Sequence, residues 1–276
     1  MGKKYEKDGS PVNLYGKWFD RSLRNAANSV YNKWLGNYTT AYNTWKRIES
    51  ISTLFNEEVN QRGDRLRILD VGCGDALPLF ILDSDINTPE YYGIDVSLLD
   101  IAFAERLKEL LKADNVTFVV GDADRLPFQD SLFDIVICSE VLEHLDHPEA
   151  CLKEIRRILK NGGTALISTP NENNLITKFP KIFKIAHKES AGGILKMKEH
   201  NSRDEHISVR SVKAWRQTFL STGFSVTVIK RHGILYGGYK YNKHRLLFAV
   251  TIVVDWMLDC LSLGQYLSEG VTFKLE

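Results

Sequence analysis

Short apolar runs alternate with amphipathic segments from residue 66 onward. Each run ends at a Gly, an acidic residue or a hydroxyl residue, as buried parallel strands often do. The expected strands are 67–71, 91–94, 116–120, 133–138 and 164–168. Helical patterns lie between them, most clearly at 98–112 and 149–159. This alternation predicts an α/β fold with a doubly wound sheet, whose ligands bind at the carboxyl ends of the strands.

The pattern changes on both sides of this region. Aromatic residues before it recur at steps of three and four, namely Tyr31, Trp34, Tyr38, Tyr42 and Trp45. They predict side chains on one helical face, which packs in the core or closes over a ligand. Gly36-Asn37 leaves open whether the segment is one helix or two. After it, residues 171–208 form a connection of the length typical of lids. A helix over 209–221 and a strand over 224–230 follow.

The last part of the chain contains its longest apolar run, 246–254, inside a predicted helix over 243–263. The run is far shorter than the roughly 20 apolar residues of a membrane-spanning helix, so we expect no transmembrane segment. We expect this apolar run to line a pocket, or to dock on a membrane or on a second subunit. Residues 270–275 are expected to form a final strand at the edge of the sheet.

Composition narrows the class of protein. With 276 residues, 43% of them hydrophobic, the chain is expected to be globular: residues 1–65 as an N-terminal helical cap and 66–276 as the main domain. The four cysteines contain no CxxC pair, which argues against a zinc site or a disulfide framework. The first residues show no apolar export segment and no myristoylation pattern, so we expect no export signal or lipid anchor. We therefore expect a cytoplasmic protein.

The sharpest motif is Ile-Leu-Asp-Val-Gly-Cys-Gly-Asp-Ala at 68–76, a strand that runs into a Gly-rich turn and a helix. Gly72 and Gly74 permit positive φ and a close approach of the backbone to a ligand. A dinucleotide fingerprint would need Gly at position 77, where Leu77 stands. Binding of a diphosphate is therefore a weak interpretation.

Two further strand ends carry acidic residues. Asp95 follows Gly74 by 21 positions, where a carboxylate can accept hydrogen bonds from ribose hydroxyls. Asp122 can accept one from an adenine amino group, and the small Ala123 leaves room for the ring. Each residue alone would also suit a helix cap or a solvated loop. The ordered set predicts an adenosine site without a diphosphate.

Between residues 66 and 170 the chain resembles the class I S-adenosylmethionine-dependent methyltransferases, and is similar to the ubiquinone-pathway type O-methyltransferases. The matching segments are Leu-Asp-Val-Gly-Cys-Gly at 69–74, Gly-Ile-Asp-Val-Ser at 93–97, Gly-Asp-Ala at 121–123, Leu-Pro-Phe at 126–128, Phe-Asp at 133–134 and Ser-Glu-Val-Leu-Glu-His-Leu at 139–145. The resemblance implies a Rossmann-like, mostly parallel seven-stranded sheet of order 3-2-1-4-5-7-6, with 270–275 as the antiparallel seventh strand. The chain departs from the family at Ala76, where a third Gly is common.

The resemblance also implies S-adenosylmethionine as cofactor, whose sulfonium and ammonium suit an acidic surrounding. The implied cofactor-binding residues are Asp70, Gly72, Cys73, Gly74 and the Ser139 carbonyl for the methionyl end, Asp95 for the ribose, and Asp122 and Ala123 for the adenine. Val96, next to Asp95, is also expected to bind the cofactor.

The acceptor side has one candidate catalytic residue, His144, because imidazole suits proton abstraction near neutral pH. A structural histidine would look the same. With Glu140 and Glu143 it forms ExxEH, which on a helix would place all three side chains on one face. The string resembles a divalent-metal site, for Mg²⁺ for example, of ubiquinone-pathway O-methyltransferases and small-RNA 2′-O-methyltransferases. His206 is the first choice for a further ligand and His200 the second, although the string also occurs where no metal is implied.

The net charge of +1 conceals a segregation of charge. Residues 66–173 contain nine basic and 20 acidic side chains, whereas 174–276 contain 16 and eight. The insertion holds Lys178, Lys181, Lys184, Lys188, Lys196 and Lys198. These lysines favour an anionic or amphipathic acceptor, or simply form a solvated face.

Together these features predict an enzyme that methylates a small molecule at oxygen, with residues 14–62 and 171–208 covering the acceptor. One alternative is an RNA methyltransferase of the 2′-O type, which the ExxEH string and the basic insertion favour. The absence of an appended RNA-binding module opposes it. The other alternative is an inactive S-adenosylmethionine-binding protein, which the intact Gly72, Gly74, Asp95 and Asp122 oppose.

Overall fold

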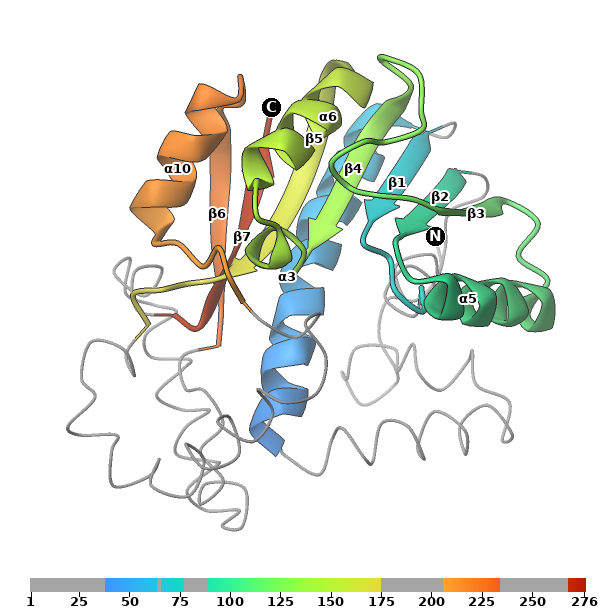
Figure 1. Ribbon diagram of the computed structural model, residues 1–276, viewed down its shortest axis with the longest axis horizontal. Coiled ribbons are helices and arrows are strands. Elements are labelled where there is room, and N and C mark those ends of the chain that lie inside the picture. The colour runs from blue at the N-terminus through green and yellow to red at the C-terminus, as the bar shows by residue number, and fades with distance from the viewer. Residues whose placement is uncertain (1–37, 64–65, 77–88, 175–205, 234–267) are drawn as a thin grey trace.

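A computed structural model describes residues 38–63, 66–76, 89–174, 206–233 and 268–276. The strands are β1 (Arg67–Val71), β2 (Glu90–Asp95), β3 (Val116–Val120), β4 (Phe133–Ser139), β5 (Leu159–Pro170), β6 (Val226–His232) and β7 (Gly270–Leu275). They form one sheet of order β3-β2-β1-β4-β5-β7-β6 (Figure 1). The first five strands are parallel, and β7 is antiparallel to both β5 and β6. The predicted fold class and strand order are confirmed.

Four expectations about individual strands need correction. The strand at Gly270–Leu275 is not at an edge, because it lies between β5 and β6. Strand β3 does form an edge, and Thr117 and Val120 are consequently exposed rather than buried. Strand β5 starts five residues before the predicted 164, through a polar stretch that apolar periodicity does not detect. Strand β6 is shifted by two residues relative to 224–230.

Helices cover both faces of the sheet. They are α3 (Tyr38–Arg62), α5 (Leu98–Leu111), α6 (Pro148–Ile158) and α10 (Val212–Ser221), together with the short 3-10 helix η1 (Leu142–His144). One hydrophobic cluster joins Leu69 and Val71 to α6 and α10, and a second joins Ile68 to α3 and α5. The alternation of side chains along β1 therefore builds two core layers. Figure 1 shows α6 in front of the sheet and α3 behind it.

The helix α3 belongs to the core and also reaches the strand ends. Ile51, Leu54, Phe55 and Val59 share one helical face and are buried against the sheet. The helix continues past the carboxyl ends of the strands (Figure 1), so it can supply side chains there. The described helix begins at Tyr38.

Several expectations lie wholly or mainly outside the described residues. They concern the aromatic positions 31 and 34, the insertion between 175 and 205 with its lysines and His200, and the apolar segment 243–263. Within the described part of the chain, no helix has the length and apolar character that a membrane span requires.

Candidate functional site

A cavity of about 190 Å³ lies where β1 and β4 end beside α3. The strand ends contribute Asp70, Gly72, Cys73, Asp75, Ile137 and Ser139, and the helix contributes Arg47, Ile48 and Ile51. Four of the residues predicted for the methionyl end are thus brought together in one lining. Arg47 has no motif around it, and the sequence contains no signal by which it could have been found.

The Gly-rich turn is shaped by backbone conformations that favour glycine. Gly72 has a φ of 72°, and a Cβ at this position would clash with the Val141 side chain. Its N–H and that of Cys73 both donate to the Ile94 carbonyl, at 2.7 and 3.1 Å, which ties the turn to β2. Ala76 has a φ of 59°. This position, where the resemblance leads one to expect a third Gly, therefore has a left-handed backbone in this chain.

Asp95 joins the ends of β1 and β2. Its Oδ2 accepts a hydrogen bond from the Gly74 N–H at 2.9 Å, and its Oδ1 accepts one from the Ser97 N–H at 2.8 Å. A carboxylate has about four acceptor sites, so two remain for hydroxyl donors. Val96 beside it is 61% exposed. Asp95 thus keeps acceptor capacity beside an exposed apolar side chain; that it binds the ribose stays a prediction.

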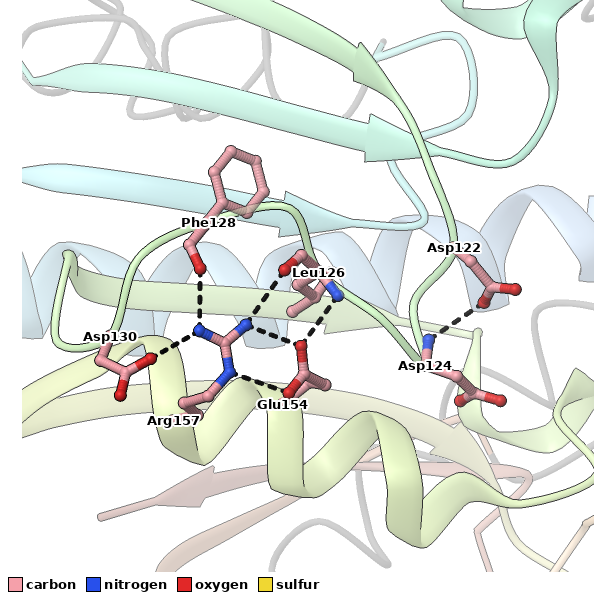
Figure 2. Close-up of polar contacts among 7 residues, drawn as sticks. All are labelled: Asp122, Asp124, Leu126, Phe128, Asp130, Glu154 and Arg157. Atoms are coloured by element: carbon pink, nitrogen blue, oxygen red, sulfur yellow. Dashed lines mark hydrogen bonds and ion pairs between the residues drawn. The ribbon is translucent and has the colours of Figure 1, made fainter.

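The loop after β3 carries Asp122 and Ala123 and is held by helix α6. Asp122 Oδ1 accepts a hydrogen bond from the Asp124 N–H at 3.0 Å. Further along the loop, the Arg157 guanidinium donates to the carbonyls of Leu126 and Phe128, at 3.0 and 2.8 Å (Figure 2). The loop that carries the predicted adenine residues is thus held by a side chain that no sequence motif marked.

The electrostatics of the cavity favour a cation. Asp70 is 5% exposed, and burial, together with the negative charge of Asp95, raises the pKa of Asp70 to about 7. A bound cation would favour its charged form. Burial, followed by the charges of Asp70 and Asp95, raises the pKa of the Cys73 thiol well above its usual range. Cys73 is therefore a neutral lining group rather than a nucleophile.

The ExxEH string does not lie on one helix, contrary to expectation. Glu140 has a left-handed φ of 57°, and the chain then enters the 3-10 helix η1 that contains Glu143 and His144. Glu140 turns toward α3, where it pairs with Arg47 at 3.2 Å and accepts a hydrogen bond from Ser168 Oγ at 3.2 Å. The spacing argument fails because it presupposes a continuous α-helix from residue 140.

Three of the four candidate metal ligands nevertheless meet. Ligand atoms of Glu143, His144 and His206 all lie within 4.8 Å of one another, and the two imidazole rings are 4.9 Å apart between centroids. The Ile207 and Ser208 N–H groups donate to the Glu143 carbonyl at 2.8 and 2.9 Å. These backbone bonds hold the segment after His206 against η1.

Glu143 is the buried member of this group, which we call the 143/144/206 cluster. Neither of its carboxylate oxygens has a hydrogen-bond partner among the described residues. Burial, with the charge of Glu140, raises the pKa of Glu143 to about 9. A buried carboxyl without partners is costly unless a cation or a proton compensates it. One carboxylate and two imidazoles suit zinc, manganese or iron, and they suit Mg²⁺ poorly because it prefers oxygen ligands.

Comparison with known proteins decides the family. Residues 63–219 match the family described as "Methyltransferase domain", and the sheet has the strand order of its class I members. The chain belongs to the class I S-adenosylmethionine-dependent methyltransferases. Membership of this family implies S-adenosylmethionine as the methyl donor.

Relatives of this methyltransferase differ in the atom they methylate. A ubiquinone biosynthesis O-methyltransferase of Candida albicans is 28% identical over 177 residues, which cover 61% of this chain and 52% of that protein. A ubiquinone/menaquinone biosynthesis C-methyltransferase of Pseudomonas putida is 31% identical over 157 residues, covering 55% and 58%. The chain spans about half the length of the curated relatives it matches. The family is therefore common to these proteins, whereas the acceptor is not.

The fold is also similar to that of the [4+2]-cyclase SpnF, with a TM-score of 0.56. The two sequences are 19% identical, and the alignment covers 82% of this methyltransferase and 80% of SpnF. At this identity the likeness concerns the fold alone, since one fold supports several chemistries.

Proposed function

We propose that this methyltransferase transfers the methyl group of S-adenosylmethionine to an oxygen of a small-molecule acceptor. The observation that carries the proposal is the 143/144/206 cluster. Its residues Glu143 and His144 lie four and five positions after the cavity residue Ser139, which ends β4. A hydroxyl acceptor must lose its proton to become a good nucleophile. The cluster supplies groups that take up a proton or bind a cation at this strand end.

The cofactor would lie across the four strand ends. Asp70, Ser139 and the turn of Gly72, Cys73 and Gly74 would hold the methionyl end. Asp95 would bind the ribose, with Val96 beside it, and Asp122 and Ala123 would bind the adenine. Methyl transfer forms a bond between the acceptor oxygen and the methyl carbon as the bond from that carbon to sulfur breaks. The proton of the hydroxyl passes to His144 in this proposal. Residues at the strand ends mainly fix the distance and line of approach.

A cation held by Glu143, His144 and His206 is a variant of the same proposal. Such a cation would lower the pKa of the acceptor hydroxyl. A nitrogen of His144 that binds the cation has no lone pair left for the proton. Treatment with a chelator therefore separates the two variants, because only the metal-assisted one loses turnover.

The cover of the acceptor remains a prediction. Arg47, Ile48 and Ile51 of α3 line the cavity, which supports a contribution from residues 14–62. The basic insertion at 171–208 would then face the acceptor and favour an anionic or amphipathic molecule.

The experiment uses the full chain with S-adenosylmethionine carrying a carbon-13 methyl group and, in parallel, a pool of hydroxylated small metabolites or bulk RNA. The proposal predicts label in the small-molecule fraction, with the carbon-13 chemical shift of an O-methyl group. His144→Asn should reduce turnover about 100-fold or more, whereas His147→Asn, at an exposed histidine three residues later, should leave it near wild type. Label only in RNA, or only in C-methyl products, would refute the proposal.

A further inference from the structure

We propose that two copies of this chain associate through helix α5, packed antiparallel about a two-fold axis at the middle of the helix. Figure 1 shows α5 at the edge of the described fold, where it contacts β2 and β3. The described lining of the cavity contains no residue of α5. The inference is therefore independent of the proposed function.

The outer face of α5 carries an apolar stripe. Leu99, Phe103 and Leu110 are 82, 56 and 51% exposed. Their spacings of four and seven residues place them on one side of the helix. A different side of the same helix is buried against the sheet and consists of Ile101, Ala104 and Leu107. A row of large exposed apolar side chains on a packed helix is typical of a surface that meets another protein.

The stripe is complementary to itself when a second copy is turned end for end. If the pairing is centred between residues 104 and 105, side chains equally far from this centre lie opposite each other. Leu99 then faces Leu110 of the second copy, and Phe103 faces Arg106 of the second copy. Each of these contacts occurs twice. A two-fold symmetric interface requires this kind of self-complementarity.

The charges of α5 also favour the antiparallel arrangement. The Arg106 side chain is 68% exposed, and its Nη1 donates to Glu109 Oε2 at 2.7 Å. Its guanidinium would lie against the Phe103 ring of the second copy, a favourable cation–π contact. The acidic first turn, with Asp100, would lie beside the basic last turn, with Lys108. The two helix dipoles would oppose each other, whereas a parallel pair would bring like ends together.

A second copy fits this stripe better than a membrane does. The helix carries three acidic and two basic side chains, so an anionic lipid surface would repel it. Arg106 also interrupts the apolar row, which suits an aromatic partner rather than lipid tails. Because only three large apolar side chains are buried from each copy, the association should be weak, with a dissociation constant of about 10–100 μM.

The first test measures the oligomeric state of the full chain. Analytical ultracentrifugation should show monomer converting to dimer over a range of about 1–200 μM. Phe103→Asp should raise the dissociation constant at least about tenfold, since it replaces a central contact with a charge. Leu220→Asp is the matched control, because Leu220 is a 64% exposed leucine on α10. It should dimerise like the wild type, and circular dichroism should show both variants folded.

The second test determines how the two helices are paired. Leu99→Cys and Leu110→Cys, each in a Cys260→Ser background, are oxidised separately and as an equal mixture. The antiparallel pairing predicts a cross-linked dimer in the mixture and little in either variant alone, because the three other cysteines are buried. Equal cross-linking of one variant alone would refute this pairing.

Two further results would overturn the inference as a whole. One is a wild type that stays monomeric throughout the concentration range, including a monomer that binds vesicles of anionic phospholipid through Phe103. The other is a dimer that Phe103→Asp leaves unchanged, since a different surface would then hold the two copies together.

Discussion

Arg157 and Glu154, one turn apart on α6, form an ion pair with two hydrogen bonds, and both side chains also bind the loop after β3 (Figure 2). Arg157 Nε and Nη2 donate to Glu154 Oε1 and Oε2 at 2.8 and 2.7 Å, and Glu154 Oε2 accepts from the Leu126 N–H at 2.9 Å. A further bond of 2.7 Å joins Arg157 Nη1 to Asp130. The guanidinium thus uses most of its five donors on one loop.

Arg157→Met should weaken cofactor binding more than it weakens folding. Because it frees the loop that carries Asp122 and Ala123, we expect the KM for S-adenosylmethionine to rise about tenfold, with kcat changing less than about threefold. The free energy of unfolding should fall by about 1–2 kcal/mol, since the lost bonds are charge-assisted but partly solvated. Steady-state kinetics and urea denaturation measure the two effects.

The control for this prediction is Lys153→Met, an exposed cation on the same helix. It should leave the KM unchanged. A fall in kcat without a change in KM for Arg157→Met would contradict the positioning role, because the loop would then matter only after the cofactor has bound.

Gly72→Ala should abolish measurable cofactor binding, whereas Gly74→Ala should only reduce it. Both glycines have positive φ, at 72° and 52°. A Cβ at residue 72 would also clash with Val141, but one at residue 74 has no heavy atom within 4 Å. We expect Gly72→Ala to cost at least about 2 kcal/mol of stability and Gly74→Ala about 1 kcal/mol. Equal losses in calorimetry and thermal unfolding would contradict this ranking.

Ala76→Gly should stabilise the protein. Ala76 is fully buried and left-handed, with a φ of 59°, a conformation that costs a residue with a Cβ about 1–2 kcal/mol. Glycine removes this strain but loses more entropy on folding, so the expected gain is about 0.5–1 kcal/mol. The urea midpoint of unfolding should rise, with an unchanged dependence on urea concentration. A lower midpoint would show that packing of the Ala76 methyl outweighs the strain.

The candidate site residues at the strand ends could be predicted from the sequence, but the side chains of α3 and α6 that contact this region could not. Gly72 and Asp95 lie beside an apolar strand pattern, and parallel strands bring their carboxyl ends to one edge, so local sequence implies the site. Arg47 and Arg157 act through contacts between distant segments that no spacing encodes. The orientation of Glu140 was missed for a related reason, because its left-handed backbone makes a helical spacing rule inapplicable.

Cofactor affinity should depend on pH through Asp70. The pKa of about 7 in the free protein means that half of the Asp70 carboxyls are protonated near neutrality. The cationic cofactor favours the carboxylate, so binding releases a proton below pH 7 and affinity rises with pH. For a single group with this pKa, the Kd should fall about eightfold from pH 6 to 7.5 and then level off. Asp70→Asn should bind more weakly throughout this range and should lose the pH dependence.

The same group gives an opposite trend in the stability of the free protein. Because folding raises the pKa of Asp70 above its unfolded value of 3.8, the folded state binds more protons between about pH 4 and 7. The contribution of Asp70 to the free energy of unfolding is therefore largest at low pH and falls as pH rises through 7. Urea denaturation of the wild type and Asp70→Asn should show a difference in stability that changes across this window. The expected result is that affinity for the cofactor rises with pH while the stability of the free protein falls, and that Asp70→Asn removes both trends. If affinity instead fell with pH together with stability, and Asp70→Asn removed both trends, attraction between the cofactor and the Asp70 carboxylate would be refuted.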